Sequence, residues 1–424
     1  MNRLEKCTVG DLLEKGIIEQ PLDGNHGDVH PKGRDFTESG IPFIMASDIK
    51  NGVINFKSCK FISKEQADSL RIGFAKTGDV LLTHKATIGR TAIVPSLQHP
   101  YIMLTPQVTY YRIKNKNILH NAYLKYYFDS KPFQDVLRSW SGSGSTRAYL
   151  GITDQLNLPV IILPITTQEK IADVLSALDA KIILNNRINE ELQQVAKMLF
   201  GYWFVQFDFP DGNGNPYKTS GGKMEYSEEL KKEIPKGWKV TSLYDIATYT
   251  NGLPMQKYRP VNGESLPVIK IKEMNEGYSD LTEFARKDID ANCVINKGDI
   301  IFSWSASLKV MLWADKQGAL NQHIFKVTSV LYPRYFVYFQ IVNYLNHFKL
   351  MAANRKTTMG HITIDHLEES RIVVPDNNNL IEGCKKTIED ILDLITKNTM
   401  QNHELSRLRD FLLPLLLNEQ VEVS

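Results

Sequence analysis

The chain contains two copies of one unit, and this internal repeat restricts the folds it can adopt. The segment Gly78–Thr83 (GDVLLT) returns as Gly298–Ser303 (GDIIFS), and both read as a turn that enters a buried strand. Three further pairs of segments follow the same order. They are Gly40–Ile44 with Ser265–Ile269, Leu104–Gln107 with Ala319–Gln322, and Ile152–Leu156 with Ile362–Leu367. Such self-similarity indicates a duplicated domain.

A long helix is predicted at the end of each copy. Apolar residues step by three and four from Ile171 onward, and the pattern recurs at a constant offset from Cys384, which corresponds to Ile171. This spacing is typical of a coiled-coil seam. The main seam residues are Ile171, Leu178, Ile182, Asn185 and Leu192 in the first copy and Ile388, Ile395, Asn398, Leu405 and Leu412 in the second. A helix of 39 residues would be roughly 58 Å long.

Asn185 and Asn398 occupy the same seam position in the two copies. A polar residue at a seam can fix the register and orientation of the partner helix at some cost in stability. Alternatively, the seam rotates at this point and both side chains face water.

The repeat divides the chain into five segments. We expect globular domains over 1–164 and 237–375, long helices over 165–205 and 376–424, and a connector rich in Gly, Pro, Asn and Ser over 206–236. Each globular domain combines short strands with shorter helices that carry aromatic residues. The predicted class is therefore α+β, with two tandem α/β domains that are each followed by a long helix.

Positive charge is concentrated in the two globular domains. Residues 1–164 hold 20 Lys and Arg against 15 Asp and Glu, a net charge of +5, and residues 235–375 hold 17 against 13, a net charge of +4. The remaining segments are acidic. Two basic modules on an acidic frame suggest binding to a polyanion at two places.

The layout of domain, long helix, connector, domain and long helix resembles the specificity subunits of type I restriction-modification enzymes. The resemblance covers nearly the whole chain and is strongest in Gly78–Val94, Thr166–Ile182 and Trp203–Gly222. The strand segment Asn321–Val327 (NQHIFKV) adds to it. The second copy departs from the first where Ala306–Val310 replaces Ala86–Arg90 and lacks its glycine, so residue roles transfer poorly between the copies.

The resemblance implies a division of labour with other subunits. Each globular domain would be a target recognition domain that binds one half of a split, asymmetric site in double-stranded DNA. The two long helices would pair antiparallel, hold the domains apart and dock two modification subunits. S-adenosylmethionine, ATP and Mg would bind to partner subunits, including the restriction subunits, and not to this chain. Partners are also expected to cover apolar residues near the helix ends, namely Phe200, Phe411, Leu415, Leu416 and Leu417.

The candidate DNA-binding residues lie in loops and turns. Arg and Lys suit guanine, Asn and Gln suit adenine, and hydroxyl groups suit either base. The candidates are Lys85, Thr87, Arg90, Arg147 and Tyr149 in the first copy and Ser303, Lys309, His323, Arg355, Lys356 and Thr357 in the second. The alternative is that these residues form ordinary surface loops or cap strands. His84, His323 and His361 lack the spacing of metal ligands, so no metal site is expected.

A methyltransferase that acts alone and a coiled-coil scaffold are the two alternatives to a specificity subunit. A lone methyltransferase would need an (Asn/Asp/Ser)-Pro-Pro-(Tyr/Phe) motif, which Asn215–Tyr217 lacks, and the chain has no P-loop. A coiled-coil scaffold without a DNA role remains open and would lack salt-dependent DNA binding. The four cysteines form no CxxC pair, and no apolar run of 18 residues occurs, so we expect a cytoplasmic protein without a membrane span.

Overall fold

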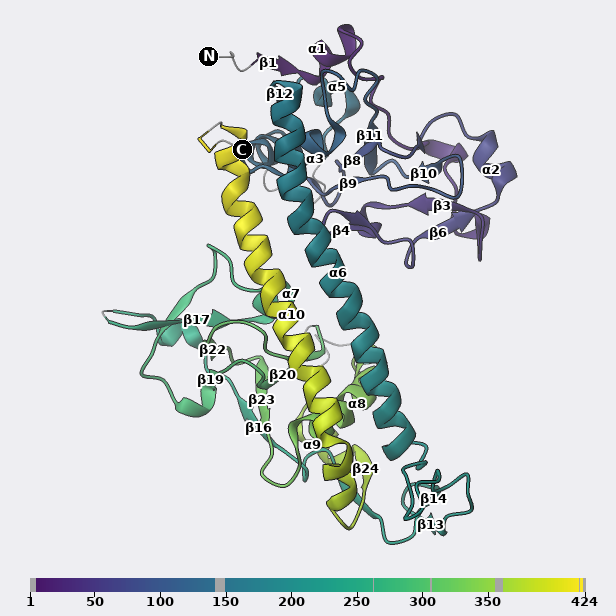
Figure 1. Ribbon diagram of the computed structural model, residues 1–424, viewed down its shortest axis with the longest axis vertical. Coiled ribbons are helices and arrows are strands. Elements are labelled where there is room, and N and C mark those ends of the chain that lie inside the picture. Colours follow the sequence, from purple (N-terminus) through teal and green to yellow (C-terminus); the bar gives the residue numbers. More distant parts are fainter. Residues whose placement is uncertain are drawn as a thin grey trace. The chain divides into compact units, whose positions relative to one another are not determined.

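The computed structural model describes residues 5–141, 149–261, 263–305, 307–354, 361–418 and 420–421. Its contacts divide the chain into two compact units, one formed by residues 1–180 with 406–424 and the other by residues 181–405. Each unit therefore contains one globular domain and parts of both long helices (Figure 1).

The first globular domain is built from short strands and five short helices. Its first strand pairs antiparallel with its last, β1 with β12, which brings both ends of the domain together. The strands are β1 (Glu5–Thr8), β2 (Phe36–Thr37), β3 (Ile41–Ile44), β4 (Ile49–Lys50), β5 (Val53–Ile54), β6 (Lys60–Ile62), β7 (Phe74–Ala75), β8 (Val80–Thr83), β9 (Thr91–Ile93), β10 (Ile102–Leu104), β11 (Val108–Tyr111) and β12 (Pro159–Ile162). The helices are α1 (Val9–Glu14), α2 (Lys64–Ser69), α3 (Asn121–Asp129), α4 (Lys131–Trp140) and α5 (Ile152–Gln155). The main sheets have the orders β2-β6-β3-β10-β7 and β11-β8-β9.

The second unit contains the connector and the second globular domain. A hairpin of β13 (Met224–Ser227) and β14 (Lys232–Pro235) lies in the connector. The later strands are β15 (Lys239–Ser242), β16 (Thr248–Asn251), β17 (Ser265–Ile269), β18 (Phe284–Arg286), β19 (Val294–Ile295), β20 (Ile300–Ser303), β21 (Lys309–Leu312), β22 (Gly318–Leu320), β23 (Ile324–Thr328) and β24 (Arg371–Val374). The helices of this domain are α7 (Ile271–Glu276), α8 (Arg334–Asn354) and α9 (Ile364–Glu369). The sheets have the orders β16-β23-β20-β21 and β18-β17-β22-β19.

The two globular domains share one topology, as the sequence repeat predicts. Each contains one parallel pair (β3 with β10, β17 with β22) and an antiparallel sheet in which the Gly-Asp strand (β8 or β20) is an inner strand. Gly78 and Gly298 adopt φ values of +89° and +87°, which favour glycine at the turn before that strand. The next residue closes the turn: Asp79 accepts a hydrogen bond from the amide of Lys76, and Asp299 accepts one from Asn296.

At two places, the residues that are equivalent in the two domains differ by one or two positions from those that the sequence repeat predicts. The amide of Thr105 donates to Ile44, and the amide of Asn321 donates to Ile269, so Thr105 corresponds to Asn321 and Gln107 to His323. The alignment by letters had paired Gln107 with Gln322. Similarly, Leu150 corresponds to Ile362, because their amides donate to His84 and Trp304 at the ends of β8 and β20. Similar letters at neighbouring positions caused both errors.

Each long helix ends in the hydrophobic core of a different unit. Helix α6 (Ile165–Phe204) contributes Ala196, Phe200 and Phe204 to the core of the second unit. Helix α10 (Asn379–Leu417) contributes Leu413, Leu416 and Leu417 to the core of the first. The expectation that partners cover Phe200, Leu416 and Leu417 is therefore wrong, because these residues are buried inside the chain's own cores. Phe411 is exposed, as expected, and Leu415 is partly buried.

The two long helices pack together as an antiparallel pair, which confirms the predicted architecture (Figure 1). Asn185 donates to Asn402, and Asn398 donates to Asn189, so rising numbers on α6 meet falling numbers on α10. Only 1% of Asn185 is exposed, and Asn398 is partly buried, so these side chains face the other helix and not water. The seam residues Ile171 and Ile388 are buried, and Leu178, Ile182, Leu192, Ile395, Leu405 and Leu412 are partly buried.

Candidate nucleic-acid interface

The turn after the Gly-Asp strand is held by a hydroxyl group in both globular domains. Thr83 ends β8 and accepts a hydrogen bond from the amide of Arg90 at 2.9 Å. Ser303 ends β20, accepts one from the amide of Lys309 at 3.1 Å and donates to the carbonyl of Ser307. Because Ser303 is completely buried, its predicted contact with DNA is wrong and its role is to cap the turn.

Two other predicted contacts are tied into their own domains. The guanidinium group of Arg90 donates to the carbonyls of Ala46 and Ile49 at 3.3 and 3.2 Å. The ammonium group of Lys309 donates to the carbonyl of Met274 at 2.8 Å and to Asn275 Oδ1 at 3.0 Å. Burial also lowers the pKa of Lys309. These groups hold the turns to neighbouring segments, and a ligand would have to displace those bonds.

Lys85 and Tyr149 remain accessible at the turn of the first domain. Their backbones pair across an isolated bridge, and the ammonium group of Lys85 lies 5.7 Å from the centre of the Tyr149 ring. Lys85 is exposed and forms no ion pair with any described residue, and 46% of Tyr149 is exposed. Thr87 is partly buried beside them. A free cation next to an exposed aromatic ring is suited to phosphate or a base.

An aromatic pair supports this surface at the same place in both domains. In the first, the buried ring of His84 lies 5.7 Å from that of Tyr149, and His84 Nδ1 donates to the carbonyl of Leu150 at 2.9 Å. Burial lowers the pKa of His84, which favours its neutral form. In the second, Trp304 replaces His84 and lies 5.5 Å from both His323 and His361. The two domains thus carry aromatic contacts of different chemistry at one equivalent position.

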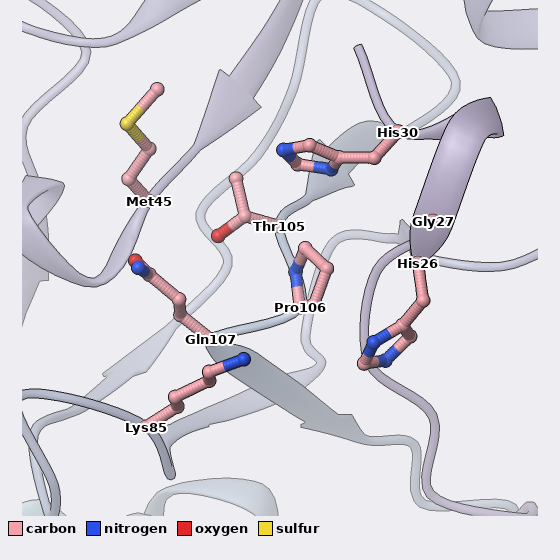
Figure 2. Close-up of a pocket in the computed structure, with 8 residues that line it drawn as sticks. All are labelled: His26, Gly27, His30, Met45, Lys85, Thr105, Pro106 and Gln107. Carbon is pink, nitrogen blue, oxygen red and sulfur yellow. The ribbon is translucent and has the colours of Figure 1, made fainter. Parts of the chain in front are cut away.

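A cavity that the sequence did not predict lies beside Lys85. In the first domain, a cavity of about 330 Å³ is lined by His26, Gly27, His30, Met45, Lys85, Thr105, Pro106 and Gln107 (Figure 2). Gln107 is the counterpart of His323, which the sequence did single out, so a correct alignment of the copies would have found it. The other predicted residues, Arg147, Arg355, Lys356 and Thr357, lie outside the described residues.

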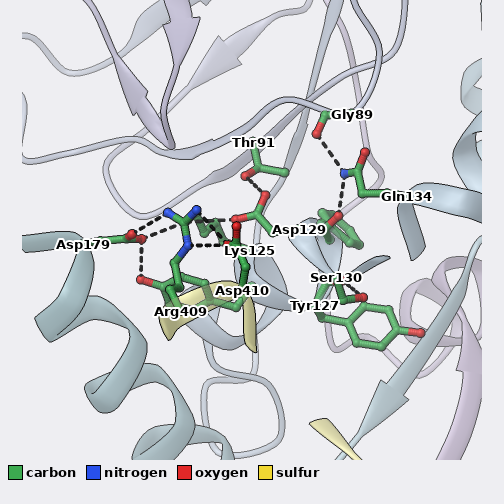
Figure 3. Close-up of polar contacts among 12 residues, drawn as sticks. Gly89, Thr91, Lys125, Tyr127, Asp129, Ser130, Gln134, Asp179, Arg409 and Asp410 are labelled. Carbon is green, nitrogen blue, oxygen red and sulfur yellow. Dashed lines mark hydrogen bonds and ion pairs between the residues drawn. The ribbon is translucent and has the colours of Figure 1, made fainter. Parts of the chain in front are cut away.

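An ionic cluster fixes the end of α10 to the first domain (Figure 3). Arg409 of α10 lies 2.8 Å from Asp179 of α6, and Lys125 of α3 lies 3.1 Å from Asp179 and 3.0 Å from Asp129. Although burial opposes it, Lys125 and Arg409 hold the pKa of Asp179 below its usual value. The three helices are therefore joined by charge as well as by apolar packing.

Each long helix exposes a pair of apolar side chains near its C-terminal end. On α6 they are Val195 and Met198, with 48% and 66% exposed, and on α10 they are Leu408 and Phe411, with 45% and 65% exposed. The pairs correspond under the repeat, since the offset that relates the two seams takes Val195 to Leu408 and Met198 to Phe411. Equivalent apolar surfaces suit two copies of one partner.

Metal ligation and membrane insertion can both be assessed in the described part of the chain. No group of three His, Cys, Asp or Glu side chains there is placed to hold a metal ion. None of the described helices is long and apolar enough to cross a membrane.

Comparisons with known proteins give one consistent result. A family model described as the type I restriction modification DNA specificity domain matches residues 5–194 and again residues 235–409. The MjaIX specificity subunit of Methanocaldococcus jannaschii is 28% identical over 408 residues, with 92% of this chain and 89% of the relative covered. The HindI specificity subunit of Haemophilus influenzae is 24% identical over 445 residues, with 90% and 94% covered. A crystal structure of an S subunit from M. genitalium has the same fold, with a TM-score of 0.55, 12% identity and 100% and 97% covered.

Proposed function

Because the chain belongs to the family of type I restriction-modification DNA specificity subunits, we propose that its two globular domains each bind one half of a split DNA site. The family match to both copies carries this proposal. Subunits of this family recognise DNA and leave the chemistry to other subunits, so the chain is not an enzyme. The alternative of a coiled-coil scaffold without a DNA role is not favoured, because both copies match a DNA specificity domain.

The face at the ends of β8 and β20 is the proposed contact surface of the two recognition domains. Lys85 and Tyr149 in the first domain and Trp304, His323 and His361 in the second support this assignment, because they lie at equivalent positions and most are accessible. Exposed cations would contact phosphates or guanine, and rings and polar groups would contact bases. The different residues in the two domains account for an asymmetric site.

The paired helices are proposed to set the distance between the half-sites. Helix α6 has 40 residues and is therefore roughly 60 Å long, which exceeds the 34–36 Å of one DNA turn. The Val195–Met198 and Leu408–Phe411 surfaces are proposed to dock two modification subunits. S-adenosylmethionine, ATP and Mg would bind to the modification and restriction subunits, and the assembly would act on DNA in the cytoplasm.

The proposed function is tested by mapping DNA modification. The chain is expressed with the modification subunit from its own operon in cells that lack adenine methylation, and the genome is sequenced for methylated bases. Methyladenine at one split, asymmetric motif, absent when this chain is omitted, is expected. If the purified complex binds all duplexes equally and no motif is methylated, recognition by this chain is excluded.

A further inference from the structure

The cavity in the first recognition domain presents hydrogen-bond donors to whatever enters it. Figure 2 shows Met45, Gln107 and Lys85 on one side and His26 and His30 on the other, with Thr105 and Pro106 between them. No carboxylate group lines it among the described residues. Asp23, an acid behind the wall, is buried and lies 2.8 Å from His26 Nε2. Lys85 is therefore the lysine or arginine that brings a positive charge to the lining of the cavity.

The backbone fixes the orientation of the Gln107 side chain. The amide of Ala46 donates to Gln107 Oε1 at 3.3 Å, so the oxygen faces the domain and the amide nitrogen is left for a ligand. Exchanging the oxygen and nitrogen of this side chain would place two donors against each other. Gln107 Nε2 has no partner among the described residues, and neither has the ammonium group of Lys85 apart from the Tyr149 ring.

A second polar group without a partner lies in the cavity wall. Only 4% of Thr105 is exposed, and its hydroxyl oxygen makes no hydrogen bond in the described part of the chain. A buried hydroxyl group without a partner is unfavourable by about 1–3 kcal/mol, so such groups usually meet a water molecule or a ligand. The unused donor of Gln107 therefore points to a ligand in this cavity, whereas the Thr105 hydroxyl has almost no exposed surface and does not contact that ligand.

Two adjacent donors select one base by its hydrogen-bonding edge. In the major groove, guanine offers two acceptors, O6 and N7, whereas adenine pairs the N7 acceptor with an amino donor. We propose that Lys85 and Gln107 recognise a guanine in the half-site bound by the first recognition domain. This inference rests on the proposed function and names the base that one of its two domains reads.

The second domain lacks this arrangement. Ser305 stands at the position of Lys85 and is buried, and His323 stands at that of Gln107. The ring of His323 packs against Trp304 at 5.5 Å. The guanine contact is therefore specific to one half-site, and changes in the cavity should leave recognition of the other half-site intact.

Guanine analogues test the inference in the complex of this chain with its modification subunit. Once the wild-type motif is known, each guanine in a duplex is replaced in turn by 7-deazaguanine, which lacks the N7 acceptor, and binding is measured. At one guanine, the replacement should lower the affinity of the complex for the duplex on the order of tenfold. Of the Lys85→Ala and Gln107→Leu complexes, the one that lacks the donor to N7 should no longer respond when that guanine is replaced, while guanines in the other half-site keep their effects.

A variant of nearly the same size and shape, Gln107→Glu, tests the guanine contact without relying on a change that could unfold the domain. Gln107→Glu keeps an acceptor for the amide of Ala46 but turns an acceptor toward the base, so the variant should reject guanine at this position and favour a base with an amino donor. Lys116→Ala removes another exposed lysine without an ion-pair partner among the described residues and should bind like wild type.

The possible failures can be told apart. If the wild-type complex has no sequence preference, the proposed function itself is wrong. If it recognises a motif but no guanine is sensitive to the analogue, or the variants keep the wild-type pattern, the guanine contact is wrong and recognition by the chain stands. Loss of affinity for all sequences alike in Lys85→Ala, with a lower salt dependence, would show a phosphate contact instead.

Discussion

Asp179 joins α10 to the first domain by charge. It pairs with Lys125 and Arg409, and 17% of its side chain is exposed. We expect Asp179→Asn to lower the free energy of unfolding by about 2 kcal/mol at neutral pH, because it leaves each of these two cations with only one acid. Because folding lowers the pKa of Asp179, its contribution is present above the unfolded-state value of about 3.9 and is lost as pH falls through the folded value. Urea unfolding of the full chain at pH 7 and at pH 2–3 measures both effects.

An exposed acid serves as the control for Asp179. Asp135 lies 2.6 Å from Lys131 on the surface of α4, and Asp135→Asn should change stability little at either pH, because water screens the pair. Equal losses in the two variants would show that the cluster around Asp179 contributes no more than a surface ion pair. The sequence did not predict this cluster, because Lys125, Asp179 and Arg409 come from three distant segments.

The predictability of single residues depended on whether their environment is local. The turns of Gly78 and Gly298 were predictable, because the repeated Gly-Asp pair encodes its own geometry. Ser303 was misassigned and the bonds of Lys309 within its own domain were not predicted, because the sequence does not show which side chains a turn directs inward. The cavity of Gln107 was missed, because its walls come from residues 26, 27, 30, 45, 85 and 105–107.

At the scale of elements, an asparagine cluster marks the point where the helix pair is symmetric. Asn185 bonds to Asn402 and Asn189 to Asn398, and the repeat relates one pair to the other. We expect Asn185→Leu to lower the free energy of unfolding by about 1–3 kcal/mol, because the side-chain oxygen of the buried Asn402 then loses its hydrogen-bond donor. The double variant Asn185→Leu/Asn402→Leu should recover most of the loss, since the groups that then lose a partner, Asn186 and Gln401, are exposed and can bond to water. Losses that simply add in this double-mutant cycle would contradict the coupling.

The long helices and the repeat were the most predictable elements. Both are encoded redundantly, since each copy shows the same apolar spacing along its helix and the same order of strand segments. The pairing of the helices followed from the seam, but its polar contacts required the structure, because Asn186, Thr399 and Gln401 join the cluster from positions beside the seam.

The number of modification subunits that the whole molecule binds follows from its two equivalent apolar surfaces, Val195–Met198 and Leu408–Phe411, which predict two bound copies. Met198→Asp and Phe411→Asp each place a charge in one of the two surfaces, so each variant should assemble with one modification subunit and the double variant with none. Native mass spectrometry of the co-purified complexes gives the count. Two bound subunits in both single variants would place the docking surfaces elsewhere. Tyr226→Asp, at an exposed residue of the connector, should keep both subunits.

The last prediction concerns the distance between the half-sites. Seven residues of helix add two turns, about 10.5 Å, and this matches about three base pairs of DNA at 3.4 Å each. A heptad inserted after Ile182 of α6, with a matching heptad after Glu404 of α10, keeps the asparagine cluster in register. It also leaves the Asp179–Arg409 ion pair and the Leu408–Phe411 surface unbroken. The methylated motif should then keep both half-sites and gain about three base pairs between them. The same heptad inserted after Gly214, in an exposed turn of the connector, should leave the motif unchanged. A motif that keeps its spacing in the helix variant would show that the helices do not set the distance, because no other segment was lengthened.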